Sequence, residues 1–186
     1  MPMNNTEAVL LAFKHGDRKA FAHLCNEYYD YAFRISFRIL TCEEDARDIA
    51  QEAFIKTWTS RAHYNLNHKF TTWLYTIVTN LCIDVLRKRK NNCIFNGEDI
   101  LAEVEAHDSG RRLENEEIAS IITHLASELS PKQRIVFVLR DLEGLEMHEI
   151  AQITHLSPSR IKSNLWHARQ SVKQKLTELY KYHHNT

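Results

Sequence analysis

Glycine and proline are scarce in this sequence, whose 186 residues include only 4 glycines and 3 prolines. Because both residues interrupt helices and mark turns, their scarcity favours long helices joined by few connections. Apolar residues recur at intervals of three and four, the spacing of one helix face, and no strand is needed to explain the pattern. The sequence therefore predicts an all-α protein.

Long apolar runs and a leader segment are also missing. Apolar runs such as Ile135–Leu139 are far shorter than the ~20 residues that cross a membrane. The first residues contain no basic region followed by an apolar stretch and a small-residue cleavage site. We therefore expect a soluble, cytoplasmic protein with no direct membrane insertion.

Patterns for metal binding and catalysis are absent as well. The cysteines are widely spaced and form no Cys-x-x-Cys pair: Cys25, Cys42, Cys82 and Cys93. The 11 histidines share no ligand spacing. His148 and Glu149 are followed by Gln152, where a zinc protease would have a second histidine, and no phosphate-binding glycine loop or nucleophile elbow occurs. We expect reduced structural cysteines, no metal, no cofactor and no enzyme activity.

Charge is balanced overall, with 24 basic and 24 acidic residues, but it is unevenly distributed. Helical periodicity fades between Asn91 and Glu117, and acidic residues accumulate there: Glu98, Asp99, Glu103, Glu105, Asp108, Glu114, Glu116 and Glu117. An acidic segment without periodicity is typical of a linker. We expect two small helical domains, residues 1–92 and 121–186, joined by an acidic flexible linker at 93–120.

Capping signals predict the helices of the first domain. A first helix covers Thr6–His15, and Asp17 can cap a second one. The segment Thr41–Glu44 fits a capping box that opens a third helix, which runs through Trp58. A fourth helix is expected over about Phe70–Lys90.

The second domain has the spacing of a helix-turn-helix. Ser130 and Gln133 form a capping signal for a helix over Pro131–Leu142. A helix over Glu146–Thr154 follows, then a short turn and a last helix from Pro158. Such a turn places the last helix where it can enter the major groove of DNA.

The last helix has two chemically different faces. Its apolar face is expected to point inward: Ile161, Leu165, Ala168, Val172 and Leu176. Its opposite face is expected to bind DNA and carries Ser159, Ser163, Trp166 and Gln170, flanked by Arg160, Lys162 and His167. Later basic residues are expected to meet phosphates: Arg169, Lys173 and Lys175. The alternative interpretation is a helical hairpin with a solvated basic face.

The fourth helix begins with aromatic residues and ends in a basic cluster. One stripe is expected to be buried: Trp73, Leu74, Ile77, Leu81 and Val85. A neighbouring face carries Thr76, Asn80, Ile83 and Arg87, with Asp84 beside them, and such a face can hydrogen-bond unstacked bases. The basic run Arg87–Lys90, which includes Lys88, can neutralise phosphates. The alternative is an ordinary core helix whose basic end suits the helix dipole.

The third helix carries an acidic face. Asp45, Asp48 and Glu52 share this face, and Ile55 lies near them. Acidic residues around one apolar side chain indicate a protein-docking surface. A merely solvated face is the alternative.

The motifs occur in a characteristic order along the chain. Asp45-Ala46-x-Asp48-x-x-Gln51-Glu52-x-Phe54 is followed by Trp73-Leu74-Tyr75, Asn80, Asp84, the basic cluster and the helix-turn-helix. From about Asp17 to Leu179 the chain resembles the extracytoplasmic-function (ECF) sigma factors of the sigma-70 superfamily. These proteins give bacterial RNA polymerase its promoter specificity.

The resemblance implies a role for each surface. In the first domain, sigma domain 2, it implies that these residues dock on core RNA polymerase: Asp45, Asp48, Gln51, Glu52 and Ile55. It implies that the loop Ser60–Lys69 and the following helix recognise and melt the minus-ten element through these residues: Trp73, Thr76, Asn80, Ile83, Asp84, Arg87 and Lys88. Asn80 and Asp84 match the positions nearest to a flipped base.

The second domain resembles sigma domain 4, which reads the minus-35 element of promoter DNA. The resemblance assigns this role to Ser159, Arg160, Lys162, Ser163, Trp166, His167 and Arg169. It further implies an acidic linker directed toward the active-centre cleft, and an anti-sigma partner, often membrane-anchored in this family. The chain departs from the usual pattern at His155, Asn164 and His167, which leaves its promoter sequence open.

A helix-turn-helix activator or repressor is the competing hypothesis. It would explain the second domain equally well. It does not explain a helix that combines Trp73, Tyr75 and Asn80 with a basic end, nor the acidic helix before it.

Overall fold

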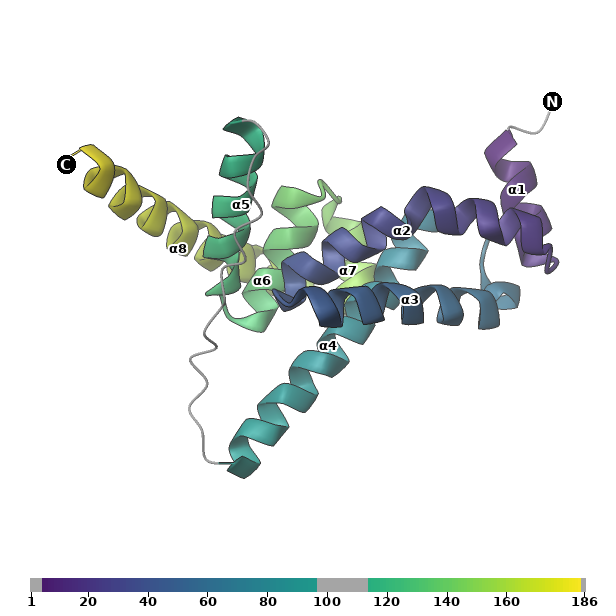
Figure 1. The fold of residues 1–186 in the computed structure, drawn as a ribbon, viewed down its shortest axis with the longest axis horizontal. Helices are drawn as coiled ribbons and strands as arrows, with labels where there is room; N and C mark the ends of the chain where they lie inside the picture. The colour runs from purple at the N-terminus through teal and green to yellow at the C-terminus, as the bar shows by residue number, and fades with distance from the viewer. Residues whose placement is uncertain (1–4, 97–113, 185–186) are drawn as a thin grey trace. The chain divides into compact units, whose positions relative to one another are not determined.

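The structure is a computed structural model that describes the backbone of residues 5–96 and 114–184 and the side chains of residues 6–89 and 121–179. Contacts divide the chain into two compact units: Met1–Asp84 with Gln152–Thr154, and Val85–Ala151 with His155–Thr186. The described residues form helices and turns and contain no strand (Figure 1). The prediction of an all-α fold is confirmed.

The first unit contains four helices, the last of which continues beyond it. The α-helices are α1 (Asn5–Lys14), α2 (Arg18–Leu40), α3 (Glu43–Thr59) and α4 (Phe70–Asn96). A short 3₁₀ turn, η1 (Arg61–His63), lies between α3 and α4. Helices α2 and α3 run antiparallel and pack along their length (Figure 1). Asp17 caps α2 as predicted, because its Oδ1 accepts hydrogen bonds from the backbone N–H groups of Lys19 at 2.6 Å and Ala20 at 3.1 Å.

The connection between α2 and α3 differs from the prediction. Thr41 is in the left-handed region with φ 55°, and its N–H donates to the carbonyl of Phe37 at 2.8 Å. It therefore ends α2, while Cys42 occupies the N-cap of α3 without a side-chain hydrogen bond. The predicted capping box at Thr41–Glu44 is wrong because a two-residue connection needs Thr41 to reverse the chain direction.

Aromatic side chains form the core of the first unit. Phe13 of α1 is fully buried, and its ring centroid lies 5.9 Å from those of Phe21 and Phe70. Trp58 of α3 lies 4.9 Å from Phe21, and Trp73 of α4 lies 6.4 Å from Phe13. Such pairs contribute about 0.5–1.5 kcal/mol each beyond the area they bury. Phe13 thus connects the short helix α1 with aromatic side chains of α2, α3 and α4.

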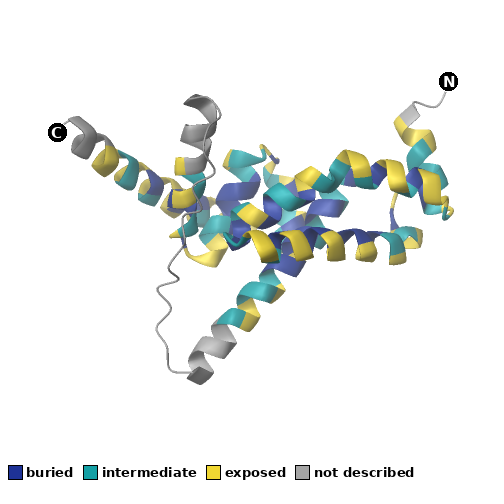
Figure 2. Ribbon diagram, viewed as in Figure 1, coloured by how far each residue is buried: buried dark blue, intermediate teal, exposed yellow. Residues whose placement is uncertain are grey.

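The second unit is a helical domain with an aliphatic core. Its helical elements are α5 (Glu114–Ser127), α6 (Pro131–Phe137), the π-helical turn η2 (Val138–Leu142), α7 (Met147–Thr154), whose last three residues are grouped with the first unit, and α8 (Pro158–His184). Buried segments alternate with exposed ones along α8 (Figure 2). The capping interaction predicted at the start of α6 is present, since the N–H of Ser130 donates to Oε1 of Gln133 at 3.4 Å.

The helix expected over Pro131–Leu142 changes its winding before it ends. Its last five residues form a π-helical turn, in which the N–H of Glu143 donates to the carbonyl of Val138 at 2.9 Å. Gly144 follows with φ 71°, a conformation that suits glycine. Sequence periodicity does not distinguish a terminal π turn from α-helix because the two differ by one residue per turn.

Other expectations can be compared with the described residues only in part. Helix α4 continues to Asn96, beyond the expected end near Lys90, and α5 begins at Glu114. Most of the predicted linker, with its acidic residues between Glu98 and Asp108, lies outside the described residues. Within residues 5–96 and 114–184, no helix has the length and apolarity of a membrane span, and no cluster of His, Cys, Asp and Glu fits a metal ion.

Candidate nucleic-acid interface

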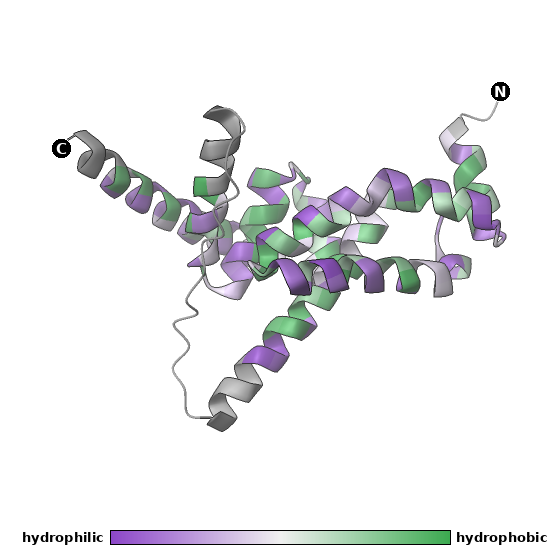
Figure 3. Ribbon diagram, in the orientation of Figure 1, coloured by the Kyte–Doolittle hydropathy of each residue, from purple (hydrophilic) through white to green (hydrophobic). Residues whose placement is uncertain are grey.

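Helix α8 has the two faces that its sequence predicts. Four of the five residues of the expected inner stripe are buried, and the fifth, Leu176, is half-buried. Every residue proposed to contact the minus-35 element is exposed. Trp166 is the most prominent, because 59% of it is exposed and its ring lies 4.8 Å from that of His167. Figure 3 shows hydrophilic and hydrophobic segments alternating along α8.

The turn before α8 is closed by a histidine instead of a glycine. His155 has φ 55°, and its N–H donates to the carbonyl of Ala151 at 3.0 Å, which ends α7. Histidine is one of the side chains that enter this left-handed region more readily than most. The departure at this position therefore leaves the helix-turn-helix geometry intact.

Arg169 forms the best-defined ion pair of the second unit. Its Nε donates to Oδ2 of Asp141 at 2.9 Å, and its Nη2 donates to Oδ1 at 2.6 Å. The hydrogen bonds to Asp141 raise the pKa of Arg169 above its ordinary value. The guanidinium thus already has an anionic partner, although 55% of the side chain is exposed.

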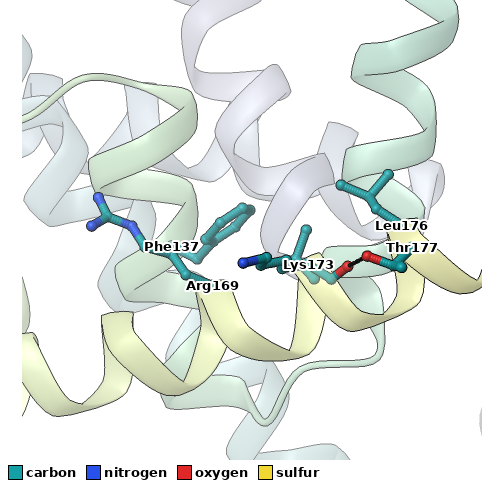
Figure 4. A pocket seen from close by; sticks show the side chains of 6 residues that line it. Phe137, Arg169, Lys173, Leu176 and Thr177 are labelled. Atoms are coloured by element: carbon teal, nitrogen blue, oxygen red, sulfur yellow. Dashed lines mark hydrogen bonds between the residues drawn. The ribbon is translucent and has the colours of Figure 1, made fainter.

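A shallow apolar groove of 380 Å³ runs beside Arg169. It is lined by Phe137 of α6 and by residues of α8: Arg169, Val172, Lys173, Leu176 and Thr177 (Figure 4). The charged groups of Arg169 and Lys173 and the hydroxyl of Thr177 are the polar parts of an otherwise apolar lining.

Helix α4 exposes part of the predicted face. Asn80, Asp84, Arg87 and Lys88 are exposed, whereas Thr76 and Ile83 are half-buried. The hydroxyl of Thr76 donates to the carbonyl of Thr72 at 2.9 Å. The buried stripe is broader than predicted: Leu74, Tyr75, Val78, Thr79, Leu81 and Cys82 are buried, while Trp73, Ile77 and Val85 are half-buried.

The loop before α4 is held by a buried tyrosine. Tyr64 is 1% exposed, and its ring lies 5.0 Å from that of Trp73 and 5.8 Å from that of Phe70. Its hydroxyl donates to the carbonyl of His68 at 2.6 Å, across the tip of the loop. Burial raises the pKa of Tyr64, which favours the neutral phenol needed as a donor. All five residues from Asn65 to Lys69 are exposed.

A second contact supports this loop from α3. The guanidinium of Arg61 lies 4.4 Å above the ring of Trp58, and its Nη1 donates to the carbonyl of Trp58 at 2.8 Å. Gly16 lies close by, since a Cβ there would be 3.5 Å from Nε of Arg61. The loop is therefore fixed at its start by a cation–π contact and across its tip by a hydrogen bond.

The acidic face of α3 is exposed. Asp48, Gln51 and Glu52 are exposed, Asp45 is half-buried, and 64% of Ile55 is accessible. Lys56 lies 3.4 Å from the Glu52 carboxylate. Among the large apolar side chains of residues 6–89 and 121–179, Ile55 is the most exposed.

The two units match two family models that occur together in one class of protein. Sigma-70 region 2 matches residues 24–92, and Sigma-70 region 4 matches residues 119–172. The ECF RNA polymerase sigma factor SigW of Bacillus subtilis (strain 168) is 32% identical over 178 residues, which cover 89% of this chain and 94% of that protein. The chain belongs to the ECF sigma factors. As such it is a non-enzymatic initiation factor that directs RNA polymerase to promoters.

Other comparisons agree with this assignment. The ECF RNA polymerase sigma-E factor of Haemophilus influenzae (strain ATCC 51907 / DSM 11121 / KW20 / Rd) is 30% identical to this sigma factor and covers 93% of this chain and 96% of its own length. The sigma factor RpoE, solved in complex with the anti-sigma factor NepR from Bartonella quintana, superposes with a TM-score of 0.71 at 20% identity, covering 86% of this chain and 98% of that one. This likeness supports the fold.

The structure also identifies residues of this sigma factor that sequence reasoning missed. No sequence motif connects Asp141 with α8. Its partner on that helix, Arg169, lies 28 positions later in the chain. Phe13 and Tyr64 look like ordinary aromatics in the sequence, and only the assembled helices show that they hold α1 and the exposed loop. Arg61 gives no signal at all, because its partners lie on the preceding helix and in the turn at Gly16.

Proposed function

We propose that this sigma factor docks on core RNA polymerase through the acidic face of α3. The observation that carries this proposal is the exposure of Ile55 among Asp48, Gln51 and Glu52. In an interface, the apolar side chain would bury area while the carboxylates pair with basic groups of the partner. By family resemblance, that partner surface is the clamp helices of the polymerase largest subunit.

The loop Ser60–Lys69 and α4 are proposed to bind the minus-ten element. Exposed Asn80 and Asp84 can hydrogen-bond an unstacked base, and Arg87 and Lys88 can neutralise phosphates on the same helix. Trp73 belongs to the aromatic core and is half-buried, so its part in DNA binding includes support of the loop through Tyr64. Flipping a base costs a few kcal/mol, which contacts of this kind must offset.

Helix α8 is proposed to read the minus-35 element in the major groove. Its first turns, the part of a recognition helix that reaches base edges, carry Ser159 and Ser163. The cations Arg160 and Lys162 flank them and can neutralise neighbouring phosphates. Trp166 and His167 extend this exposed face. The guanidinium of the remaining predicted contact, Arg169, is already bound by Asp141.

The domain division and the partners follow from these assignments. We propose domain 2 at residues 1–92 and domain 4 at 121–186, with an acidic linker at 93–120 directed toward the nucleic-acid channel of the polymerase. The chain acts in the cytoplasm, where polymerase and promoter DNA are found. An anti-sigma factor, often membrane-anchored in this family, would cover the polymerase-binding surfaces, in keeping with the anti-sigma complex of RpoE.

Run-off transcription with purified core polymerase tests the docking surface. The wild type should yield promoter-specific transcripts, and the double variant Asp48→Arg with Glu52→Arg should lose them, because charge reversal opposes docking. A matched control, Glu27→Arg with Asp30→Arg, makes the same change in net charge at exposed sites of α2, outside the proposed face, and should remain active. Equal loss in both variants would refute the docking surface.

A DNA-binding assay with the same purified proteins distinguishes a sigma factor from a helix-turn-helix repressor or activator. A duplex promoter fragment should bind the protein with polymerase and should not bind it tightly without polymerase. Tight unaided binding to duplex DNA, with no transcripts, would contradict the proposed mechanism.

A further inference from the structure

We propose that Asp141 is a positioning residue for minus-35 recognition, and that Arg169 binds Asp141 in the promoter complex instead of a DNA phosphate. This inference rests on the proposed function of α8. Arg169 then holds α8 in place through its ion pair with Asp141, here called the latch, instead of contacting DNA. Asp141, which lies outside the helix-turn-helix, gains a role in promoter recognition.

The geometry of the pair supports a latch. Two parallel hydrogen bonds of 2.9 Å and 2.6 Å join the guanidinium edge of Arg169 to both carboxylate oxygens of Asp141. This is the bidentate arrangement that best matches the planar guanidinium, and it restricts orientation as well as distance. Asp141 is the less accessible partner, with 22% of its side chain exposed against 55% for Arg169.

The position of Asp141 explains what the latch would hold. It lies in the π turn η2, next to Arg140. Arg140 binds the start of α7, the other helix of the helix-turn-helix. Its Nη1 donates to the carbonyl of Leu145 at 2.7 Å and to Oε2 of Glu146, the N-cap of α7, at 3.1 Å. Two neighbouring residues of one rigid turn therefore bind the start of α7 and the middle of α8.

Charge favours the latch over a phosphate contact. The Asp141–Arg169 pair is neutral as a unit, so it releases few counterions on approach to DNA. A phosphate would have to displace a carboxylate that already makes two charge-assisted hydrogen bonds. The cations proposed to meet DNA, Arg160 and Lys162, lie earlier on α8 and are exposed.

The first test measures how salt affects binding of the assembled holoenzyme to a promoter with a minus-35 element. Each phosphate contact contributes about 0.9 to the slope of log affinity against log salt concentration. Arg169→Gln should leave this slope unchanged, whereas the control Lys162→Gln should lower its magnitude by about 0.9. A reduction by about 0.9 in Arg169→Gln would overturn the proposal.

The second test exchanges the two charges. Asp141→Arg and Arg169→Asp should each reduce transcription that depends on the minus-35 element by about tenfold or more, because each removes both charge-assisted hydrogen bonds and places two like charges opposite each other. The double variant Asp141→Arg with Arg169→Asp should recover most of this activity, because the pair is restored with its charges reversed. If Arg169 contacted a phosphate, the exchange would place an acid against DNA and activity would stay as low as in Arg169→Asp alone.

Two controls keep the outcomes distinct. Transcription from a promoter that lacks a minus-35 element should be equal in all variants if the latch acts on promoter reading, and a parallel loss there would overturn this role. Circular dichroism and thermal unfolding identify any variant that fails to fold, in which case Asp141→Asn replaces Asp141→Arg. Failure of the wild-type protein to respond to the minus-35 element would instead refute the proposed function of α8.

Discussion

The two units of this sigma factor are stabilised by different kinds of contact. The first joins its helices with aromatic rings, from Phe13 on α1 to Trp58 and Trp73 on α3 and α4. The second unit has few aromatic residues. Residues 119–172 include only two phenylalanine, tyrosine or tryptophan residues, Phe137 and Trp166, and Trp166 is exposed. The core of this unit is aliphatic, and ion pairs such as Asp141–Arg169 and Glu128–Lys175 join parts of it that are distant in the sequence.

The difference corresponds to what each unit is proposed to bind. A unit that holds unstacked bases needs a loop with a firm base and an exposed tip, and packed rings under Tyr64 supply that base. A unit that reads duplex DNA needs one helix at a set angle, which directional ion pairs can define. Aromatic packing thus stabilises the loop before α4 in the first unit, whereas ion pairs orient α8 in the second.

The largest expected effect comes from removing the ring at the centre of the aromatic core. Phe13→Ala should destabilise the first unit by about 3–5 kcal/mol, because it leaves a cavity among several rings. Urea unfolding followed by tryptophan fluorescence measures the loss, since Trp58 and Trp73 belong to this core. Ile161→Ala, in the core of the second unit, is the matched control. Equal effects of both variants on one shared transition would contradict independent cores.

A smaller effect is expected at the loop. Tyr64→Phe removes the hydrogen bond to the His68 carbonyl and should cost about 1 kcal/mol of stability. Promoter opening, followed by 2-aminopurine fluorescence in the minus-ten element, should slow while binding to core polymerase is retained. Tyr31→Phe, at an exposed tyrosine of α2, should leave opening unchanged. Normal opening by Tyr64→Phe would show that the hydroxyl has no part in presenting the loop.

A stabilising substitution is expected in the same unit. The hydroxyl of Thr57 is buried and has no hydrogen-bond partner among the described residues. Thr57→Val keeps the side-chain shape and removes this unsatisfied group, so the free energy of unfolding should rise by about 1 kcal/mol. Thr59→Val is the control, because the Thr59 hydroxyl is exposed and already donates to the carbonyl of Ile55 at 3.1 Å. A loss of stability in Thr57→Val would show that the hydroxyl is satisfied in solution.

The smallest expected effect concerns the surface ion pair of the second unit. Glu128→Gln removes the partner of Lys175, whose side chain is 30% exposed against 47% for Glu128. Exposed pairs of this kind contribute about 0–1 kcal/mol and weaken as salt increases. Thermal unfolding at low and high salt should therefore show a small difference from wild type that disappears at high salt. A difference independent of salt would point to lost packing instead of lost charge.

Much of the fold could be predicted because its signals are local. Asp17 caps α2, Ser130 and Gln133 mark the start of α6, and the inner stripe of α8 follows helical spacing. Local signals failed at Thr41, where a polar residue before two glutamates resembles a cap but ends the preceding helix. They also placed the centre of the buried stripe of α4 imprecisely: Val78 and Cys82 are fully buried, whereas Trp73 and Val85 are half-buried.

The exposed members of the candidate site were predictable for the same reason. Asn80 and Trp166 stand opposite apolar stripes, so periodicity alone places them at the surface. Whether a surface cation is available to DNA is a different question, because it depends on which groups the rest of the fold brings near it. Nothing in the sequence around Arg169 indicates that it is already paired.

The sequence by itself determined the helical class, the order of the motifs and the faces of most helices, because these depend on residues within a few positions of one another. Only the tertiary structure decided which side chains are committed to holding the surfaces in place. Phe13, Tyr64 and the Asp141–Arg169 pair acquire their roles from the packing of elements that are distant in the chain or joined by a turn. Distances between such elements depend on the packing of whole helices, and no local pattern encodes them.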